Sequence, residues 1–289
     1  MLKMGVNALL LLLLFVCMTL LLVVVNVLLL LNLLCVAPFS AHRSRAWAAE
    51  IATGWLRVGK FYMEHVLKIS YRSHVDAKVQ ERLQAVQKGI LIANHQSMID
   101  ILVMNQLAAQ FSRQQELTWL AKNTFKYVPL LGWGAYLTGS NVYLKRDWDR
   151  DKSKLRESFD QLLVSERPFW LLFCPEGTRL TAKRLAASQA FNRRQQRPPF
   201  KRILSPRAKG FIAAVTALRP VVSAVIDVTI CYSHRPPLFA HILRGERITI
   251  DVHVKVLPID SLPTDTEGLR DWLFDLFKAK DQLLSASSP

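Results

Sequence analysis

The chain has 289 residues, long enough for one sizeable domain with attachments. Its net charge of +16 favours acidic partners, which are nucleic acid, an anionic membrane surface or phosphorylated small molecules. The four cysteines show neither CxxC spacing nor a disulfide framework, so buried, reduced thiols are expected.

An apolar segment opens the chain. No charged residue lies between Lys3 and Arg43, and Gly5–Ala37 is 33 residues of mostly Leu and Val. One helix of that length measures about 50 Å, against about 30 Å for the hydrocarbon core of a bilayer. The apolar region of a signal peptide has about half that length or less. We therefore expect a membrane anchor over residues 1–42, either one strongly tilted helix or a helical hairpin bent near Asn26.

The flanks of this segment predict its orientation. Lys3 alone precedes it, whereas four basic residues follow it: Arg43, Arg45, Arg57 and Lys60. Because cytosolic flanks of membrane helices are enriched in Lys and Arg, the rest of the chain is expected in the cytosol. Ala46–Ile69 mixes aromatic and basic residues in a helical pattern. Residues 43–75 are therefore expected to form a connecting helix, either along the membrane interface or packed on the domain.

Beyond residue 75, apolar runs typical of strands alternate with amphipathic runs. The strand-like runs are Gly89–Asn94, Arg167–Cys174, Val221–Tyr232 and Arg247–Leu257. The helix-like runs are Met98–Gln110, which Ser97 or Asn94 can cap, Asp151–Glu166 and Glu267–Leu284. This alternation predicts an α/β domain over residues 76–284, followed by a disordered tail at 285–289.

The stretch from Ala182 to Lys209 differs in composition. It has nine Lys or Arg residues and no acid, and its Gln, Ser and Pro-Pro content predicts a long loop. Such a loop is either merely solvated or, beside a membrane anchor, in contact with anionic headgroups or a phosphorylated substrate. No helix-turn-helix, RRM or zinc motif supports nucleic acid as a partner.

The stretch NHQSMID, Asn94 to Asp100, lies where an apolar strand gives way to a helix. On one regular helix, His95 and Asp100 would point about 140° apart and could not meet. They can meet if His95 lies in the turn after the strand and Asp100 in the first turn of the helix. Asp100 would then fix the tautomer of His95 and leave its other ring nitrogen free as a general base. The alternative is a satisfied histidine in a helix cap beside a solvated aspartate.

A second polar stretch, FCPEGTRL, follows the strand-like run that ends near Cys174. Gly177 permits a tight turn with exposed N–H groups, Thr178 adds a hydroxyl and Arg179 adds a guanidinium group, which together suit a phosphate. Glu176 is expected to orient Arg179 or to bind a substrate hydroxyl. Read alone, the stretch is equally compatible with a simple turn.

Together and in this order, NHxxxxD and PEGTR resemble the glycerolipid acyltransferases, the superfamily that includes 1-acylglycerol-3-phosphate acyltransferase. VYLKRDWDRD (Val142–Asp151) is similar to a further block of that family and places Arg146 at its phosphate-binding arginine. In much of the family a glycine lies six residues earlier, where this chain has Ser140. ILSPRAKGF, VIDVTICY and WLFDLFKAKDQLL look like the branch of lysophosphatidic acid and lysocardiolipin acyltransferases.

The resemblance implies a mixed sheet flanked by helices, as in glycerol-3-phosphate acyltransferases. It implies acyl transfer from acyl-CoA to the sn-2 hydroxyl of a lysophospholipid, with His95 as general base and Asp100 stabilising the imidazolium. The residues expected to bind substrate are Arg146, Glu176, Gly177, Thr178, Arg179 and Arg207. No metal and no cofactor beyond acyl-CoA as co-substrate are expected. The expected location is the endoplasmic reticulum membrane, with anionic lipids nearby and the catalytic domain facing the cytosol.

Several alternatives stay open at this point. The acceptor is lysophosphatidic acid by default, whereas lysophosphatidylinositol, lysophosphatidylglycerol or monolysocardiolipin would use the same motifs. Hydrolysis with Ser97 or Cys174 as nucleophile is a second enzymatic reading, although the sequence has no GxSxG elbow. A non-catalytic adaptor that binds anionic membranes through the basic stretch is the third.

Overall fold

The computed structural model describes residues 2–139, 141–145, 147–234, 241–242 and 244–286. The chain forms two compact units, one made of residues 1–58 and 121–145 and the other of residues 59–120 and 146–289. The second unit holds most of the sheet and all the described residues of the predicted site.

A seven-stranded mixed sheet has the strand order β1-β7-β6-β2-β5-β3-β4. Its strands are β1 (Ile69–His74), β2 (Lys88–Ala93), β3 (Leu117–Lys122), β4 (Val142–Leu144), β5 (Phe169–Phe173), β6 (Ala224–Tyr232) and β7 (Ile248–Pro258). The central strand β2 is parallel to both of its neighbours, β5 and β6, whereas β6 and β7 form an antiparallel pair. The expected α/β fold with a mixed sheet is confirmed.

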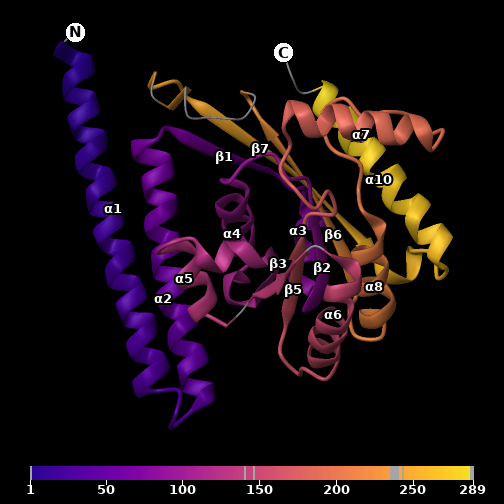
Figure 1. The fold of residues 1–289 in the computed structure, drawn as a ribbon, viewed down its shortest axis with the longest axis horizontal. Coiled ribbons are helices and arrows are strands. Elements are labelled where there is room, and N and C mark those ends of the chain that lie inside the picture. Colours follow the sequence, from indigo (N-terminus) through magenta and orange to yellow (C-terminus); the bar gives the residue numbers. More distant parts are fainter. Residues whose placement is uncertain (1, 140, 146, 235–240, 243, 287–289) are drawn as a thin grey trace. The chain divides into compact units, whose positions relative to one another are not determined.

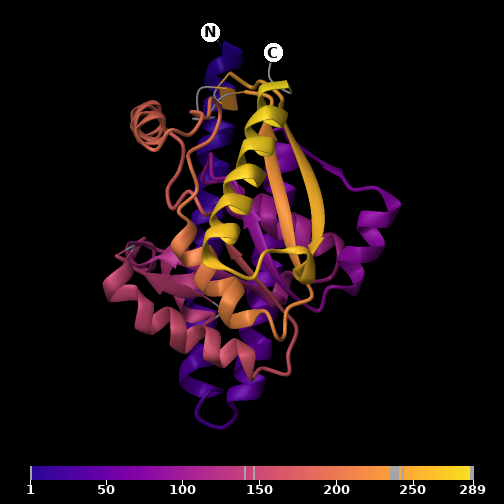
Figure 2. The ribbon, with the colours of Figure 1, turned by 90° about the vertical axis from the view of Figure 1, so that its right-hand side faces the viewer.

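Helices cover both faces of this sheet (Figure 1). They are α3 (Ala77–Ala85), α4 (Asp100–Gln110), α6 (Trp148–Leu163), α8 (Ala208–Leu218) and α10 (Thr266–Ala286), whereas α7 (Ala182–Arg194) stands clear of the sheet (Figure 2). Alternate residues of β6 serve the two faces. Ala224, Ile226, Val228 and Ile230 pack in one buried cluster with Val103 and Leu107 of α4, because successive side chains of a strand point to opposite sides.

The opposite face of β6 meets α10. Figure 2 shows α10, in yellow, along the orange ribbon of β6 and β7. Lys280 of α10 and Asp227 of β6 form an ion pair at 2.5 Å, with only 1% and 4% of their side chains exposed. Lys280 also donates to the carbonyl oxygen of Val228 at 2.6 Å. A charge that is buried this deeply is tolerated only with such partners.

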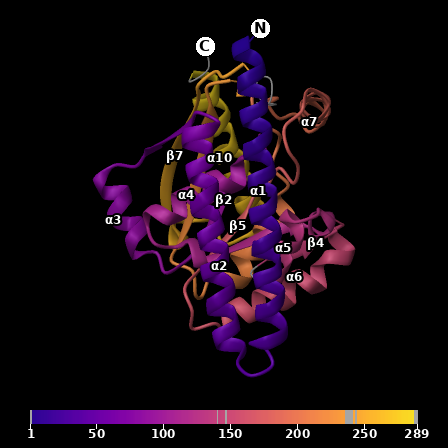
Figure 3. The ribbon, with the colours of Figure 1, turned by 90° about the vertical axis from the view of Figure 1, so that its left-hand side faces the viewer.

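The other unit contains α1 (Leu2–Cys35) and most of α2 (Ala41–Phe61), which lie side by side and are joined by a short turn (Figure 3). Leu12–Cys35 is long and apolar enough to cross a membrane. The helix does not break near Asn26, so a hairpin bent there is wrong. The amide of Asn26 instead donates to Leu22 and Leu130 carbonyl oxygens, and that of Asn32 donates to Ser44. Asn26 and Asn32 of the apolar segment are therefore used in packing contacts.

Two expected segments differ from the structure. Residues 43–75 are not helical throughout, because α2 is followed by a single π-helical turn (Tyr62–Val66) and then by β1, which pairs with β7. Residues 182–209 are not one long loop, because Ala182–Arg194 forms α7, capped by the hydroxyl of Thr181. The tail expected at 285–289 is helical as far as Ala286, and residues 287–289 lie outside the described residues.

Candidate active site

The structure brings His95 and Asp100 together. His95 follows the end of β2, and Asp100 is the first residue of α4. Asp100 Oδ2 lies 2.8 Å from His95 Nδ1, and the two side chains are 3% and 20% exposed respectively. Among the residues that the structure describes, no group hydrogen-bonds to Nε2 of His95. The pair therefore has the geometry of a base held by a buried carboxylate, with its second nitrogen available.

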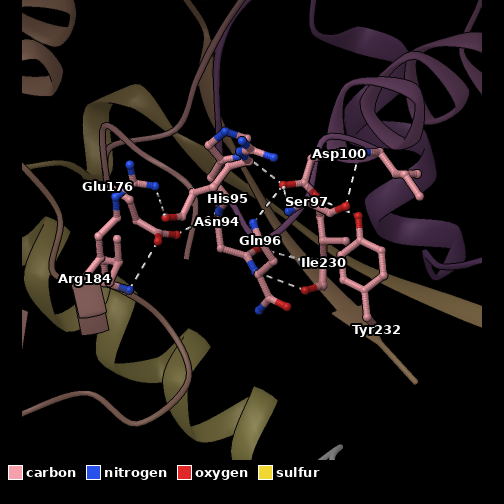
Figure 4. Close-up of polar contacts among 12 residues, drawn as sticks. Asn94, His95, Gln96, Ser97, Asp100, Glu176, Arg184, Ile230 and Tyr232 are labelled. Atoms are coloured by element: carbon pink, nitrogen blue, oxygen red, sulfur yellow. Dashed lines mark hydrogen bonds and ion pairs between the residues drawn. The ribbon is translucent and has the colours of Figure 1, made fainter. Parts of the chain in front are cut away.

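Asp100 is fixed by more than the histidine (Figure 4). Its Oδ2 atom also accepts the backbone N–H groups of Gln96 at 2.8 Å and Ser97 at 2.9 Å. Its Oδ1 atom accepts the hydroxyl of Tyr232, the last residue of β6. The turn between β2 and α4 thus wraps around one carboxylate, because three N–H donors of the turn converge on the same oxygen.

Asn94 ties this turn to the neighbouring strand. Its side-chain nitrogen donates to the carbonyl oxygen of Ile230 at 3.0 Å, and its side-chain oxygen accepts the N–H of Ile230 at 2.8 Å. The amide thereby replaces a backbone partner at the point where β2 leaves the sheet. Neither Asn94 nor Ser97 caps α4, since the N-cap residue is Ile99.

Glu176 supports the backbone of His95 from the opposite side. Its Oε1 atom accepts the His95 N–H at 2.8 Å and its Oε2 atom accepts the Leu204 N–H at 3.2 Å. The residue is only 2% exposed, and burial raises its pKa to about 8 although these two hydrogen bonds and Lys280 lower it. Both oxygens of the Glu176 carboxyl group therefore accept backbone N–H groups. Glu176 forms neither a hydrogen bond nor an ion pair with the described side chain of Arg179.

The remaining predicted residues surround the turn after β5. Gly177 has a φ of +69°, and a Cβ atom there would lie 3.3 Å from Cδ of Arg207. The backbone N–H of Arg207 donates to Pro175, and that of Leu180 donates to the carbonyl oxygen of His95 at 2.9 Å. Arg179 and Arg207 are both exposed, whereas Thr178 is half-buried. The turn therefore lies directly beside His95 and presents two guanidinium groups to solvent.

Two residues of this region, Tyr232 and Arg184, were not predicted from the sequence, and one predicted residue, Arg146, lies outside the described residues. Tyr232 gave no signal because it is 132 residues from Asp100 in the chain. Arg184 was not singled out because it belongs to the stretch that was expected to be a loop. Its Nη1 donates to the carbonyl oxygen of Arg179 at 3.2 Å. Arg146 and Ser140 lie outside the described residues, so the role of Arg146 stays a prediction.

The two alternative nucleophiles, Ser97 and Cys174, lie in different surroundings. Ser97 is 8% exposed and its Oγ accepts the N–H of Ile99 at 3.3 Å, so it serves the local turn. Cys174 is half-buried and packs against the main hydrophobic cluster. Among the described residues Ser97 makes no hydrogen bond to His95, which a Ser–His pair would require.

One group of described residues has the composition of a metal site, away from the predicted site residues in the sequence. Ligand atoms of His234, His241 and Glu246 lie within 4.8 Å of one another. They are already engaged with each other, because His241 Nδ1 lies 2.5 Å from Glu246 Oε2 and the two histidine rings stack. That no metal takes part at His95 stays a prediction.

Comparison with known families agrees with this geometry. The family model described as Acyltransferase matches residues 74–233, which is more than half of the chain and spans β2 to β6. The model described as Acyltransferase C-terminus matches residues 241–286, which include β7 and α10.

Individual relatives give the same result. The chain is 32% identical to 1-acyl-sn-glycerol-3-phosphate acyltransferase 2 of Brassica oleracea over 200 residues, or 68% of this chain and 51% of that protein. It is 34% identical to 1-acyl-sn-glycerol-3-phosphate acyltransferase delta of Homo sapiens over 197 residues, or 68% and 52%. It is 29% identical to 1-acyl-sn-glycerol-3-phosphate acyltransferase 3 of Arabidopsis thaliana over 262 residues, or 89% and 69%. The chain thus spans about half the length of the first two relatives. It belongs to the acyltransferase family, within the glycerolipid acyltransferase superfamily.

Proposed function

We propose that this protein transfers an acyl group from acyl-CoA to the sn-2 hydroxyl of 1-acyl-sn-glycerol-3-phosphate, which yields phosphatidic acid. The observation that carries the proposal is the His95 Nδ1–Asp100 Oδ2 contact, which leaves Nε2 without a partner among the described residues. The names of the relatives support this acceptor, although the chain spans about half of their length.

The chemistry follows from that contact. Nε2 of His95 removes the proton of the acceptor hydroxyl while the oxygen attacks the thioester carbonyl. Asp100 stabilises the imidazolium that forms. The tetrahedral intermediate collapses, the C–S bond breaks and the CoA sulfur leaves with the proton returned from His95. All atoms and charges balance without a metal or further cofactor.

The phosphate of the acceptor is assigned to the turn after β5. Gly177 keeps this turn open to the side chain of Arg207, and Arg179 precedes Leu180, which is hydrogen-bonded to His95. Guanidinium groups bind phosphate through paired N–H donors. A phosphate held there would place a nearby hydroxyl of the same small molecule within reach of His95. Thr178 and, by resemblance, Arg146 complete this assignment.

The role of Glu176 is assigned differently from the sequence-based expectation. Because both of its oxygens accept backbone N–H groups, it is proposed to hold the backbone of His95 and Leu204 rather than a substrate hydroxyl. Its removal would then act on the base indirectly.

The length and composition of α1 indicate a membrane protein. The endoplasmic reticulum and a cytosolic catalytic domain are proposed from the basic residues that follow α1 and from the lipid acceptor. Anionic lipids are proposed to contact α7, whose exposed residues include Lys183, Phe191 and Arg194. These three lie near one helix face, where an aromatic ring flanked by cations suits an anionic interface.

An acceptor panel tests the proposed function. The full chain is purified in detergent, and release of CoA thiol from oleoyl-CoA is followed with each lysophospholipid. Release with lysophosphatidic acid alone supports the proposal. Release only with lysophosphatidylinositol, lysophosphatidylglycerol or monolysocardiolipin would move the protein to phospholipid remodelling, and no release with any acceptor would favour the membrane adaptor.

A further inference from the structure

The final residue of β6 reaches the proposed catalytic pair from a distant part of the chain. Tyr232 lies on the same face of β6 as Val228 and Ile230, which is the face that packs against α4. Its hydroxyl donates to Oδ1 of Asp100 (Figure 4). The side chain of Asp100 is only 3% exposed, so water does not compete freely for this oxygen.

The two oxygens of Asp100 are served by different parts of the fold. Oδ2 accepts N–H groups of the local turn and of His95. Oδ1 accepts the hydroxyl of Tyr232, and no other donor to Oδ1 is found among the described residues. A buried carboxylate oxygen without a donor is costly, since hydrogen bonds to charged groups are stronger than those between neutral groups. The hydroxyl therefore both neutralises part of the charge and prevents rotation of the carboxylate.

We propose that Tyr232 is a positioning residue of the proposed acyl transfer: its hydroxyl fixes Asp100 in the plane that aligns His95, and it limits how strongly Asp100 attracts a proton onto His95. This inference rests on the proposed function for its role in catalysis. It concerns a hydroxyl that acts through Asp100 and does not itself touch the substrate.

The phenol remains a donor over the working pH range. Burial raises the pKa of Tyr232 well above its usual value, and the neighbouring Asp100 and Cys174 raise it further, whereas Ser97 lowers it. The titratable groups around Tyr232 and Asp100 are His95 and Cys174, with Glu176 beyond the His95 backbone. Because Tyr232 withdraws negative charge from Asp100, loss of the hydroxyl strengthens the attraction between Asp100 and a protonated His95.

The variant Tyr232→Phe removes this hydroxyl and keeps the ring. With oleoyl-CoA and lysophosphatidic acid, we expect kcat to fall about tenfold, which is the lower limit for a hydrogen bond to a charged group. The KM for either substrate should change less than threefold, and the acidic limb of the pH–rate profile should move to higher pH. The control is Tyr71→Phe, which removes a solvent-shielded hydroxyl on the edge strand β1.

A double-mutant cycle with Asp100→Asn separates positioning from general stability. If Tyr232 acts through Asp100, the second substitution has little further effect once Asp100→Asn is present. Thermal unfolding of both tyrosine variants shows whether the fold is retained. A kcat within twofold of the wild-type value with an unchanged acidic limb would overturn the inference, as would full additivity in the cycle.

A second readout does not require turnover. Histidine-selective ¹⁵N labelling, with the His95 signal assigned by its loss in His95→Ala, follows the titration of that ring in the full chain in detergent. We expect its titration midpoint to move to higher pH in Tyr232→Phe and not in Tyr71→Phe. An unchanged midpoint contradicts the role of Tyr232 even in an active enzyme. Wild-type protein inactive on every acceptor contradicts the proposed function alone.

Discussion

Oε1 of the buried Glu176 accepts the backbone N–H of His95 at 2.8 Å, so a carboxylate from the turn after β5 holds the residue that follows β2. The two strands are adjacent and parallel, and their ends therefore meet at one edge of the sheet. Glu176 is 81 residues from His95 in the chain, so the pairing of the two strands, not their sequence separation, brings these residues together.

The raised pKa of Glu176 predicts a pH-dependent stability. A carboxyl group with a folded-state pKa of about 8, against 4.5 for the ordinary group, favours folding fully below 4.5 and loses this contribution as pH rises through about 8. The melting temperature should thus fall more between pH 6 and 9 in the wild type than in Glu176→Gln, which cannot ionise. The exposed Glu166→Gln is the control. Parallel melting curves for wild type and Glu176→Gln would show that Glu176 does not titrate in this range.

Arg179 should affect binding of the acceptor more than the chemical step. Arg179→Ala is expected to raise the KM for lysophosphatidic acid about tenfold, in line with a charge-assisted hydrogen bond to phosphate, whereas Arg179→Lys keeps the charge and loses the paired donors. Steady-state kinetics with varied acceptor measure this effect. Arg156→Ala, at a side chain 86% exposed on α6, is the control. Equal KM values for all variants would show that the phosphate of the acceptor does not bind at this turn.

The buried ion pair of Lys280 and Asp227 predicts a large effect on stability. Lys280→Met leaves Asp227 without its 2.5 Å partner and should destabilise the fold by about 3–5 kcal/mol. Adding Asp227→Asn removes the stranded charge and should restore part of this loss. Chemical denaturation in detergent, followed by tryptophan fluorescence, compares the single and double variants. A double variant less stable than Lys280→Met would show that the uncompensated charge is not the cause.

The exposed face of α7 predicts a dependence on anionic lipid. Lys183→Glu with Arg194→Glu reverses two charges beside Phe191 and should reduce the gain in activity that anionic phosphatidylglycerol gives in phosphatidylcholine nanodiscs. Lys152→Glu with Lys154→Glu makes the same net change on exposed residues of α6 and serves as control. An equal gain in both double variants would contradict a specific contact of α7 with anionic lipid.

The sequence contained enough information for the central pair but not for its supports. The change from apolar to polar residues at Asn94 predicted a strand, turn and helix, and only this geometry lets His95 reach Asp100. Tyr232 and Ile230 could not be found in this way, since they approach through the order of strands in the sheet. The sheet order depends on long-range packing that no local pattern reports.

Other differences have local reasons. β1 has the sequence ISYRSH and was not predicted as a strand because it contains charged and polar residues. Such residues are common in an edge strand, and β1 has only one neighbour in the sheet, β7. The segment of α7 reads as a loop because Pro198 and Pro199 follow it closely, yet the helix ends at Arg194 before the prolines begin. Asn26 suggested a bend in α1. Its side-chain amide instead donates a hydrogen bond to the carbonyl oxygen of Leu130, and the helix continues without a break. A polar residue in an apolar helix can therefore mark a contact rather than a break.

The most direct test of the account is the rate of CoA release by His95→Ala, with oleoyl-CoA and lysophosphatidic acid, beside wild type and His65→Ala. His65 is an exposed histidine that contacts the carbonyl oxygen of Phe61, so its loss leaves the proposed base intact. We expect His65→Ala to match the wild type and His95→Ala to lose at least a hundredfold in rate, as general-base catalysis contributes about 10²–10⁴-fold. A His95→Ala variant that turns over at the wild-type rate would contradict acyl transfer through His95.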